Sequence, residues 1–472
     1  MFEEIAPGAV VDGYRIAERI HVGAQSQIFR VSEPAREFPI IMKVPRIGPD
    51  EPSENLISFE TEALILPALS GPHVPRFVAA GDLAKVPYLV AEWVEGESLE
   101  SMLKRGNLPP AEVARIGAAI ADAVHDLHLQ DAIHLDLKPD NIIVKPDGSV
   151  VLIDFGLAHH ERYPDLLAEE KRFAAGSAPY VSPEQVLGTR SDPRSDIFAL
   201  GVALYEMATG RLPFGIPKTM AGLRDRLWLD PVPPRMRAPE VSRWLQEIIL
   251  RCLEPSADDR YQSGAHLAFD LRSPEKVSLT GRGYKSRQAG LLGQIQRWWR
   301  ARGVQLQANT GPRSRASEAA PVIMVAVDTT HPDDARQPAL QRATARVLSL
   351  SAEFRLICVS VIRGGPGAEA AGDSAHLDHL VLLRNWVEPL RLSPQRLSLH
   401  VIESPSPEGA LIEFARRNNV DLILIGAPSP TQHALAWWRS VASGVTARAH
   451  CSVYAVRIPE PDLNSERDSD FT

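Results

Sequence analysis

The chain has 472 residues, 44% of them hydrophobic and 23% charged, and a formal net charge of -8. A chain of this length is too long for a single hydrophobic core, so we expect two or three domains. Its net negative charge argues against nucleic-acid binding. Three widely spaced cysteines favour a reducing compartment without disulfides. The acidic N-terminus lacks the apolar run of a signal peptide, and no apolar stretch is long enough to span a bilayer. We therefore expect a cytoplasmic protein without a transmembrane segment.

The first part of the chain alternates between short β-rich runs and one helix. Three runs, 13–23, 26–34 and 38–46, are separated by turn residues, and residues 54–66 show helical spacing that ends at Pro67. After a further apolar run, "PYLVAEWVEG", the pattern turns mostly helical. Apolar residues three and four apart predict helices within 110–130, 195–210 and 241–255. A small β-rich lobe followed by a larger helical lobe is the expected architecture.

The stretch "AIHLDLKPDNIIV", residues 132–144, holds a chemically suggestive set of side chains. Asp136 can accept a proton from a hydroxyl, Lys138 can steady a phosphoryl group in transfer, and Asn141 can hold a metal ion. Thirteen residues further on, Asp154 precedes Phe-Gly, where a carboxylate can hold Mg2+ that bridges nucleotide phosphates. Such a set is typical of phosphoryl transfer, which depends on positioning and charge neutralisation.

Together with Lys43 in "IIMK" and Glu62 on the predicted helix, these residues resemble the eukaryotic-like (Hanks-type) serine/threonine protein kinases of bacteria. The resemblance covers roughly residues 10–275 and implies an α+β two-lobed protein kinase fold. ATP is the implied co-substrate, with Mg2+ or Mn2+ as cofactor and proteins as substrates. The resemblance implies one role for each of these residues: phosphate binding by Lys43, pairing with it by Glu62, catalysis by Asp136 and Lys138, and metal binding by Asn141 and Asp154.

Further matches concern the scaffold and the adenine pocket. Glu184 in "SPE" would pair with Arg260, and Asp196 would anchor the catalytic loop. The resemblance makes Ala91 the gatekeeper residue behind adenine, which is usually larger. The remaining implied ATP-binding positions lie in the glycine-rich loop and the hinge: Gly23, Ile28, Glu92 and Val94.

The glycine-rich loop departs from the family pattern. In "IHVGAQSQIF" only Gly23 remains, because His21 and Ser26 occupy the other two glycine positions and Ile28 replaces a valine. Glycines allow backbone N–H groups to approach phosphates closely. We therefore expect weakened ATP binding.

Leu135 stands where the family has an arginine that pairs with a phosphate on the activation loop. Residues 157–176 also contain no serine or threonine, and the first hydroxyl of this kind is Ser177. The arginine that would bind a regulatory phosphate and the hydroxyl residues that would carry that phosphate are thus both missing. We expect an enzyme that is not controlled by activation-loop phosphorylation, with the segment held by packing of Leu166, Leu167 and Phe173 against the helical lobe.

From 276 to 320 the chain is rich in Arg, Gly, Ser and Gln and is predicted to be a linker. It contains a short basic amphipathic helix with Leu291, Trp298 and Trp299 on one face, which either packs on a domain or rests on a membrane surface. From 321 to 458, four apolar runs alternate with three helical segments and predict an α/β, doubly wound parallel sheet. Residues 459–472 are polar, and we expect them to be a disordered tail.

The C-terminal region resembles the universal stress protein family over residues 321–458. Members that bind ATP use an aspartate after the first strand and glycines around the phosphates, and Asp328, Gly426 and Ser440 fit this weak candidate site. Ser429 and Arg439 replace glycines, which argues against tight binding, although Arg439 could itself reach a phosphate. The family often dimerises through its last strand, so residues 451–456 are a candidate homodimer edge.

The sequence as a whole therefore predicts a protein serine/threonine kinase regulated by a C-terminal stress-protein-like module. The alternative is a pseudokinase scaffold that binds nucleotide and recruits partners without transferring phosphate.

Overall fold

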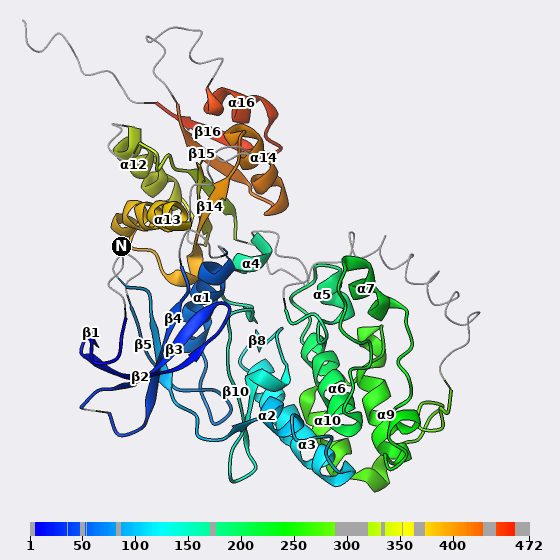
Figure 1. The fold of residues 1–472 in the computed structure, drawn as a ribbon. Helices are drawn as coiled ribbons and strands as arrows, with labels where there is room; N and C mark the ends of the chain where they lie inside the picture. The colour runs from blue at the N-terminus through cyan, green and yellow to red at the C-terminus, as the bar shows by residue number, and fades with distance from the viewer. Residues whose placement is uncertain are drawn as a thin grey trace, which may run out of the picture. The chain divides into compact units, whose positions relative to one another are not determined.

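The computed structural model describes residues 5–34, 36–47, 52, 54–81, 86–169, 176–287, 320–331, 336–351, 353–362, 373–427 and 440–457. The chain forms two compact units, one from Met1–Arg46 and Glu54–Arg315 and another that contains Ala316–Thr472 (Figure 1). The predicted helix with Trp298 and Trp299, the residues Phe173, Ser429 and Arg439, and the C-terminal tail lie outside the described residues. Among the described residues, no helix combines the length and the apolar character needed to cross a membrane.

The N-terminal lobe of the first unit is an antiparallel sheet with the strand order β1-β2-β3-β4-β6-β5. Its strands are β1 (Val10–Val11), β2 (Tyr14–Val22), β3 (Ser26–Ser32), β4 (Ile40–Pro45), β5 (Phe77–Ala80) and β6 (Leu89–Glu92), and helix α1 (Glu54–Ile65) lies beside them. The period of two along β4 buries Ile40 and Met42 in the lobe's apolar core. Lys43 consequently points away from that core, toward α1.

The second lobe is mainly helical. Its longer helices are α3 (Pro110–His128), α6 (Arg194–Thr209), α9 (Arg243–Cys252) and α10 (Gly264–Arg272). Helix α6 is almost wholly buried and packs against α3 and α9, so it forms the centre of the lobe (Figure 1). Short helices complete the lobe: α2 (Leu99–Leu103), α4 (Leu166–Glu169), α5 (Pro183–Val186), α7 (Met220–Arg224) and α8 (Pro234–Arg237).

Two small sheets carry the loops between the lobes. One pairs β7 (Glu97–Ser98) and β10 (Val150–Leu152) with β9 (Ile142–Val144), and another pairs β8 (Ala132–Ile133) with β11 (His159–His160). Because β8 and β9 flank residues 134–141, and β10 directly precedes 153–155, these sheets fix both acidic loops that the sequence identified.

The second unit has a five-stranded parallel sheet in the order β14-β13-β12-β15-β16. Its strands are β12 (Val322–Ala326), β13 (Arg355–Ile362), β14 (Leu397–Glu403), β15 (Leu422–Gly426) and β16 (Ser452–Val456). Its helices are α12 (Arg336–Leu348), α13 (Asp373–Val387), α14 (Pro407–Arg417) and α16 (Val441–Arg448). Helices α14 and α16 pack on one face, over a core that includes Met324, Ile357 and Ile423. The predicted doubly wound sheet is confirmed, and the two-lobed fold before it is confirmed as well.

The sequence prediction for this unit omitted one helix and one strand, α13 and β14. Helix α13 does carry a regular pattern, with Leu377, Leu380, Leu383 and Val387 all buried. Strand β14 is harder to predict because its inward-facing residues include Ser398 and His400, which are polar. The strand therefore lacks a simple alternation of apolar and polar residues.

Candidate active site

Lys43, Glu62 and Asp154 meet between the lobes of the first unit. The Lys43 Nζ donates to Glu62 Oε2 at 2.5 Å and to Asp154 Oδ1 at 2.8 Å, and the Phe155 amide donates to Glu62 Oε1 at 3.2 Å. Burial alone would lower the pKa of Lys43, but the two carboxylates outweigh it and raise that pKa above its ordinary value. For Asp154 burial acts in the opposite direction and would raise the pKa, yet the Lys43 charge holds that pKa at about 2. The lysine is thus charged and fixed in place.

The catalytic-loop residues form a second cluster around the Asp136 carboxylate. Lys138 Nζ donates to Asp136 Oδ2 at 3.0 Å and to Ser177 Oγ at 2.9 Å. The Ser177 amide donates to Asp136 Oδ1 at 2.7 Å, and Asn141 Nδ2 donates to the Asp136 carbonyl at 2.9 Å. These contacts orient a nearly buried carboxylate, with a lysine beside it, at the start of the segment where a substrate hydroxyl would arrive.

Asp196, which is completely buried on α6, holds the backbone just before this carboxylate. Its two oxygens accept the amides of His134 and Leu135, both at 2.9 Å, and His128 Nε2 lies 2.9 Å from Oδ2. Leu135 has a left-handed φ of 61°, a conformation that costs a non-glycine residue energy. The leucine side chain is buried, and the Gln185 side chain donates to its carbonyl at 2.8 Å. Both ends of the strained peptide are therefore bonded.

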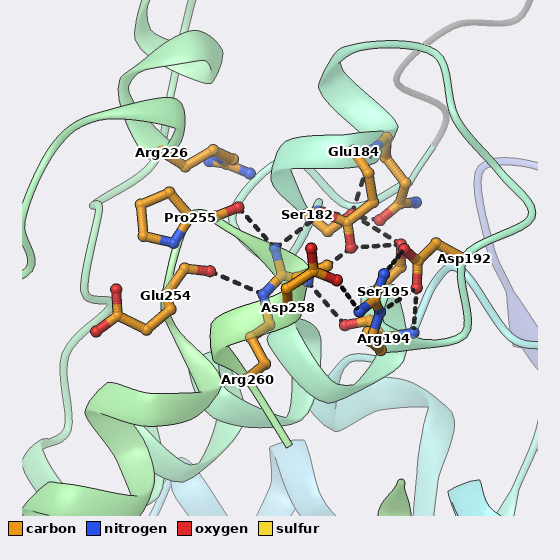
Figure 2. A network of polar contacts seen from close by, with 12 residues as sticks. Ser182, Glu184, Asp192, Arg194, Ser195, Arg226, Glu254, Pro255, Asp258 and Arg260 are labelled. Carbon is orange, nitrogen blue, oxygen red and sulfur yellow. Dashed lines mark hydrogen bonds and ion pairs between the residues drawn. The ribbon is translucent and has the colours of Figure 1, made fainter. Parts of the chain in front are cut away.

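Glu184 and Arg260 form the centre of a network of polar contacts (Figure 2). Arg260 donates to both carboxylate oxygens of Glu184, at 2.7 and 2.8 Å, and also to the backbone carbonyls of Arg194, Glu254 and Pro255. Its guanidinium is fully buried. The predicted pair is thus present, and it joins α5 to the loop before α10.

A second arginine holds the activation segment itself, and no sequence motif indicated it. Arg190 Nε donates to both oxygens of Asp165, at 3.0 and 2.9 Å, while its Nη2 donates to the Leu157 carbonyl at 2.9 Å. Asp165 also caps α4 by accepting the Ala168 amide at 3.1 Å. Burial would raise the pKa of Asp165, but His159 and Arg190 lower it to about 2.

The predicted packing of the activation segment needs a correction. Leu166 and Leu167 are buried, but they pack against Ile57 on α1, in the N-terminal lobe, instead of the helical lobe. Helix α4 contacts α1, and α1 offers an apolar face that includes Leu56, Ile57 and Phe59. The segment therefore contacts the helix that carries Glu62.

A buried arginine, Arg226, was also missed. Its Nη1 donates to the carbonyls of Ala178 and Val181, at 2.9 and 2.5 Å, and its side chain lies near the Phe214 ring. Within the described residues its Nε and Nη2 have no hydrogen-bond partner, and burial lowers its pKa to about 10. It fixes the loop that follows Ser177.

The positions implied for adenine lie on strands β3 and β6 and directly after β6. Ala91 is buried on β6 opposite Ile41, and Ile28 pairs with Lys43 across β3 and β4. Among described residues, the amide N–H of Val94 has no acceptor, as a hinge donor requires, while the amide of Glu92 donates to Arg76. Gly23 is not among the glycines with a positive φ, and a Cβ added there would make only ordinary van der Waals contacts.

The donor set fits a hard divalent cation. Asn141 uses its amide nitrogen toward Asp136, and among described residues its Oδ1 accepts no hydrogen bond. Asp154 engages Lys43 through Oδ1 alone, and its side chain is about one-third exposed. Each residue thus presents one oxygen that remains available, and oxygen ligands are those that Mg2+ and Mn2+ prefer.

In the candidate site of the second unit, the acidic side chain is already hydrogen-bonded within its own loop. Asp328 follows β12, and Gly426 is the last residue of the adjacent strand β15, at the point where the strand order reverses. Ser440 caps α16 by accepting the Ser443 amide at 3.1 Å. The Asp328 carboxylate, however, already accepts the Thr330 amide at 3.0 Å and lies 3.1 Å from His331 Nδ1.

Comparison with known proteins agrees with this geometry. The family model for the protein kinase domain matches residues 14–269, and that for the universal stress protein family matches residues 321–457. The chain belongs to the protein kinase family and carries a C-terminal universal stress protein domain, as the resemblance implied.

Three curated relatives illustrate the range of similarity. Probable serine/threonine-protein kinases of Clostridium acetobutylicum and Clostridium perfringens are 29% and 33% identical, over 55% and 46% of this chain and 39% and 32% of their own lengths. Serine/threonine-protein kinase PknB of Mycolicibacterium smegmatis is 30% identical over 56% of this chain and 43% of its own length. The chain thus spans less than half the length of the curated relatives it matches. Among solved structures, the Mycobacterium tuberculosis PknI kinase domain aligns with a TM-score of 0.46 and 22% identity, over 57% of this chain and 99% of that one.

Proposed function

We propose that this chain is a protein serine/threonine kinase that transfers the γ-phosphoryl group of ATP to protein hydroxyls. The observation that carries the proposal is the convergence of Lys43, Glu62 and Asp154 in one set of contacts of 2.5 and 2.8 Å. The trio serves nucleotide binding, and the equally complete cluster around Asp136 is the part that only transfer of phosphate requires.

Each residue has a definite task in the proposed reaction. Asp136 accepts the proton of the attacking hydroxyl, and Lys138 neutralises charge on the phosphoryl group in transfer. Lys43, held by Glu62, binds the α- and β-phosphates, and the adenine ring lies against Ile28 and Ala91 with the hinge at Glu92 and Val94. Asn141 and Asp154 would hold the divalent cation, which supplies positive charge against the phosphate oxygens.

Labelled ATP provides the test. The purified full chain, with Mg2+ or Mn2+, should incorporate labelled phosphate into itself and into a generic basic protein, and Lys43→Met should abolish that incorporation. Equal labelling in reactions with the wild type and with Lys43→Met would instead support the pseudokinase scaffold, which binds nucleotide without transferring phosphate.

We also propose that the activity of this kinase is not controlled by phosphorylation of its activation loop. This proposal is supported by Asp165, a permanent carboxylate that already holds the activation segment through Arg190, without any added phosphate. Leu135 is occupied in packing and has no charge to offer. Enzyme stripped by a phosphatase should phosphorylate an exogenous substrate without a lag. A lag that disappears after phosphorylation within residues 157–183 would contradict this part of the proposal.

Regulation by the C-terminal domain is the remaining part of the proposal, together with homodimerisation through β16. This strand ends the sheet, and Tyr454 on it is about half exposed. Two domains joined there would bring two kinase domains to a high local concentration. Sedimentation of the full chain should show a dimer that Tyr454→Lys weakens, together with a concentration-dependent specific activity that the variant loses. A wild-type monomer at all concentrations would rule out this route. The cytoplasmic location stays a prediction.

A further inference from the structure

A strap, residues 277–287, follows the last helix of the kinase lobe and folds back on α9. It lies beyond residue 269, where the match to the protein kinase family ends. Gln246, which is fully buried, donates to the carbonyls of Arg282 and Lys285 at 2.8 and 3.0 Å. Residues beyond the part of the chain that matches the protein kinase family therefore anchor the strap to the helical lobe.

Charge also holds the strap. Arg282 Nε donates to Glu254 at 2.7 Å, and Lys285 forms an ion pair with Asp230, which is buried. In both pairs the cation comes from the strap and the anion from the lobe. Negative charge added to the strap would oppose this arrangement.

Thr280 is the point at which such a charge could be added. Its side-chain hydroxyl donates to Glu247, with Oγ–Oε distances of 2.8 and 3.0 Å, and its amide donates to Glu247 Oε2 at 2.8 Å. The Gly283 amide donates to the same Oε2 at 2.8 Å. Glu247 is only 3% exposed, whereas Thr280 is exposed on irregular backbone, accessible to an enzyme after a small local opening.

We propose that Thr280 is a phosphorylation site and that its modification releases the strap from α9. The proposal rests on the proposed kinase activity. The Thr280 oxygen attacks the γ-phosphorus of a nucleoside triphosphate, and the bond from that phosphorus to the β-phosphate oxygen breaks. A nucleoside diphosphate leaves with the bonding electrons, and the hydroxyl proton passes to a catalytic Asp136 carboxylate.

Release follows from the chemistry of the product. An esterified threonine oxygen has no proton to donate, and the phosphate brings up to two negative charges beside the Glu247 carboxylate, which has little access to solvent. The phosphate also competes with Glu254 for Arg282, so the strap loses its best cationic anchor. Three of the strap's contacts are therefore weakened by one modification.

Phosphosite mapping tests the modification. The wild-type full chain is incubated with ATP and Mg2+, beside Lys43→Met and Thr280→Val, with a generic basic protein in each reaction. The expected result is phosphate on Thr280 in the wild type alone, and phosphate on the basic protein with both wild type and Thr280→Val. Labelled basic protein without phosphate on Thr280 would overturn this inference while leaving the proposed function standing; no label anywhere would overturn the proposed function and this site with it.

Hydrogen exchange tests the release without relying on activity. Thr280→Glu adds negative charge, and Thr280→Gln is its neutral control of the same size. The Gly283 amide should exchange on the order of tenfold faster in Thr280→Glu than in Thr280→Gln, because a charge-assisted hydrogen bond is lost. Amides of α3 should be unchanged in both. Equal exchange at Gly283 in the two variants, or slower exchange in Thr280→Glu through a new contact with Arg282, would overturn the release.

Discussion

Asp154 and Asp328 are acidic residues at candidate nucleotide sites of the two units, and they are held in opposite ways. Asp154 is bonded to Lys43, which lies 111 positions away in the chain, and keeps one oxygen available. Asp328 is satisfied by Thr330 and His331, its own neighbours. A carboxylate fixed by a distant cation can receive a ligand without reorganisation, whereas a carboxylate engaged by its own loop must first give up those contacts.

Matched substitutions of Asp154 and Asp328 should differ strongly in their effect on phosphate transfer. Asp154→Asn should lower phosphate transfer by about a hundredfold to a thousandfold, because it removes charge that the reaction requires. Asp328→Asn should leave transfer within about twofold, since its carboxylate serves its own loop. Both are measured as initial rates on a generic basic protein at saturating ATP. A large loss from Asp328→Asn would show that the two sites are functionally linked.

The same contrast between distant and local partners applies to stability. Glu184→Gln leaves the buried Arg260 without its carboxylate and should cost about 3 kcal/mol or more in the free energy of unfolding of the kinase unit. Its control is Asp122→Asn, which breaks an exposed ion pair with Arg272 and should cost less than about 1 kcal/mol. Denaturant titration of the full chain measures both. Equal losses would mean that burial of Arg260 carries no special penalty.

Asp165 adds a dependence on pH. Its pKa is about 2 in the folded protein, below the ordinary value of 3.8, so the charged form stabilises the fold. The contribution is fully present above about pH 4 and is lost as the pH falls toward 2; a shift of this size corresponds to roughly 2 kcal/mol. The difference in unfolding free energy between wild type and Asp165→Asn should therefore shrink over that interval. A difference that stays constant would show that the Asp165–Arg190 contact is not electrostatic in origin.

The smallest expected effect concerns Ala91. A small buried residue at this position should leave space behind adenine, so purine analogues with a bulky substituent should inhibit the wild type about tenfold better than Ala91→Met. Dose–response curves at equal ATP occupancy measure the ratio. Equal potency against both proteins would place Ala91 away from the adenine pocket.

The sequence predicted those contacts whose residues lie in motifs with fixed chemistry. Lys43 with Glu62, Glu184 with Arg260 and the anchoring by Asp196 are of this kind, and all are present. Asp165 with Arg190 could not be predicted in the same way, because any of several charged residues could have met once the chain folded. Arg226 was equally hidden, since it bonds only to backbone carbonyls, which leave no trace in a sequence.

The missed elements of the second unit show the other limit. Helix α13 carried a readable spacing of buried leucines, whereas β14 buries His400 against the Phe414 ring, and polar inward residues disguise a strand. Asp328 and Gly426 do lie at the carboxyl ends of the adjacent strands β12 and β15. What could not be read was that Asp328 would be engaged by its neighbours, because that depends on the conformation of one short loop.

The strap changes where this protein can be divided. A chain ended at residue 275, just past the boundary of family similarity, would lack Gly283 and Lys285, which contact Glu247 and Asp230, and the strap carbonyls to which Gln246 donates. Such a fragment would expose to solvent the Glu247 and Asp230 carboxylates that the strap now covers. An isolated kinase domain should therefore end after residue 287. A fusion that joined a new module at residue 270 would lack the strap that completes the helical lobe.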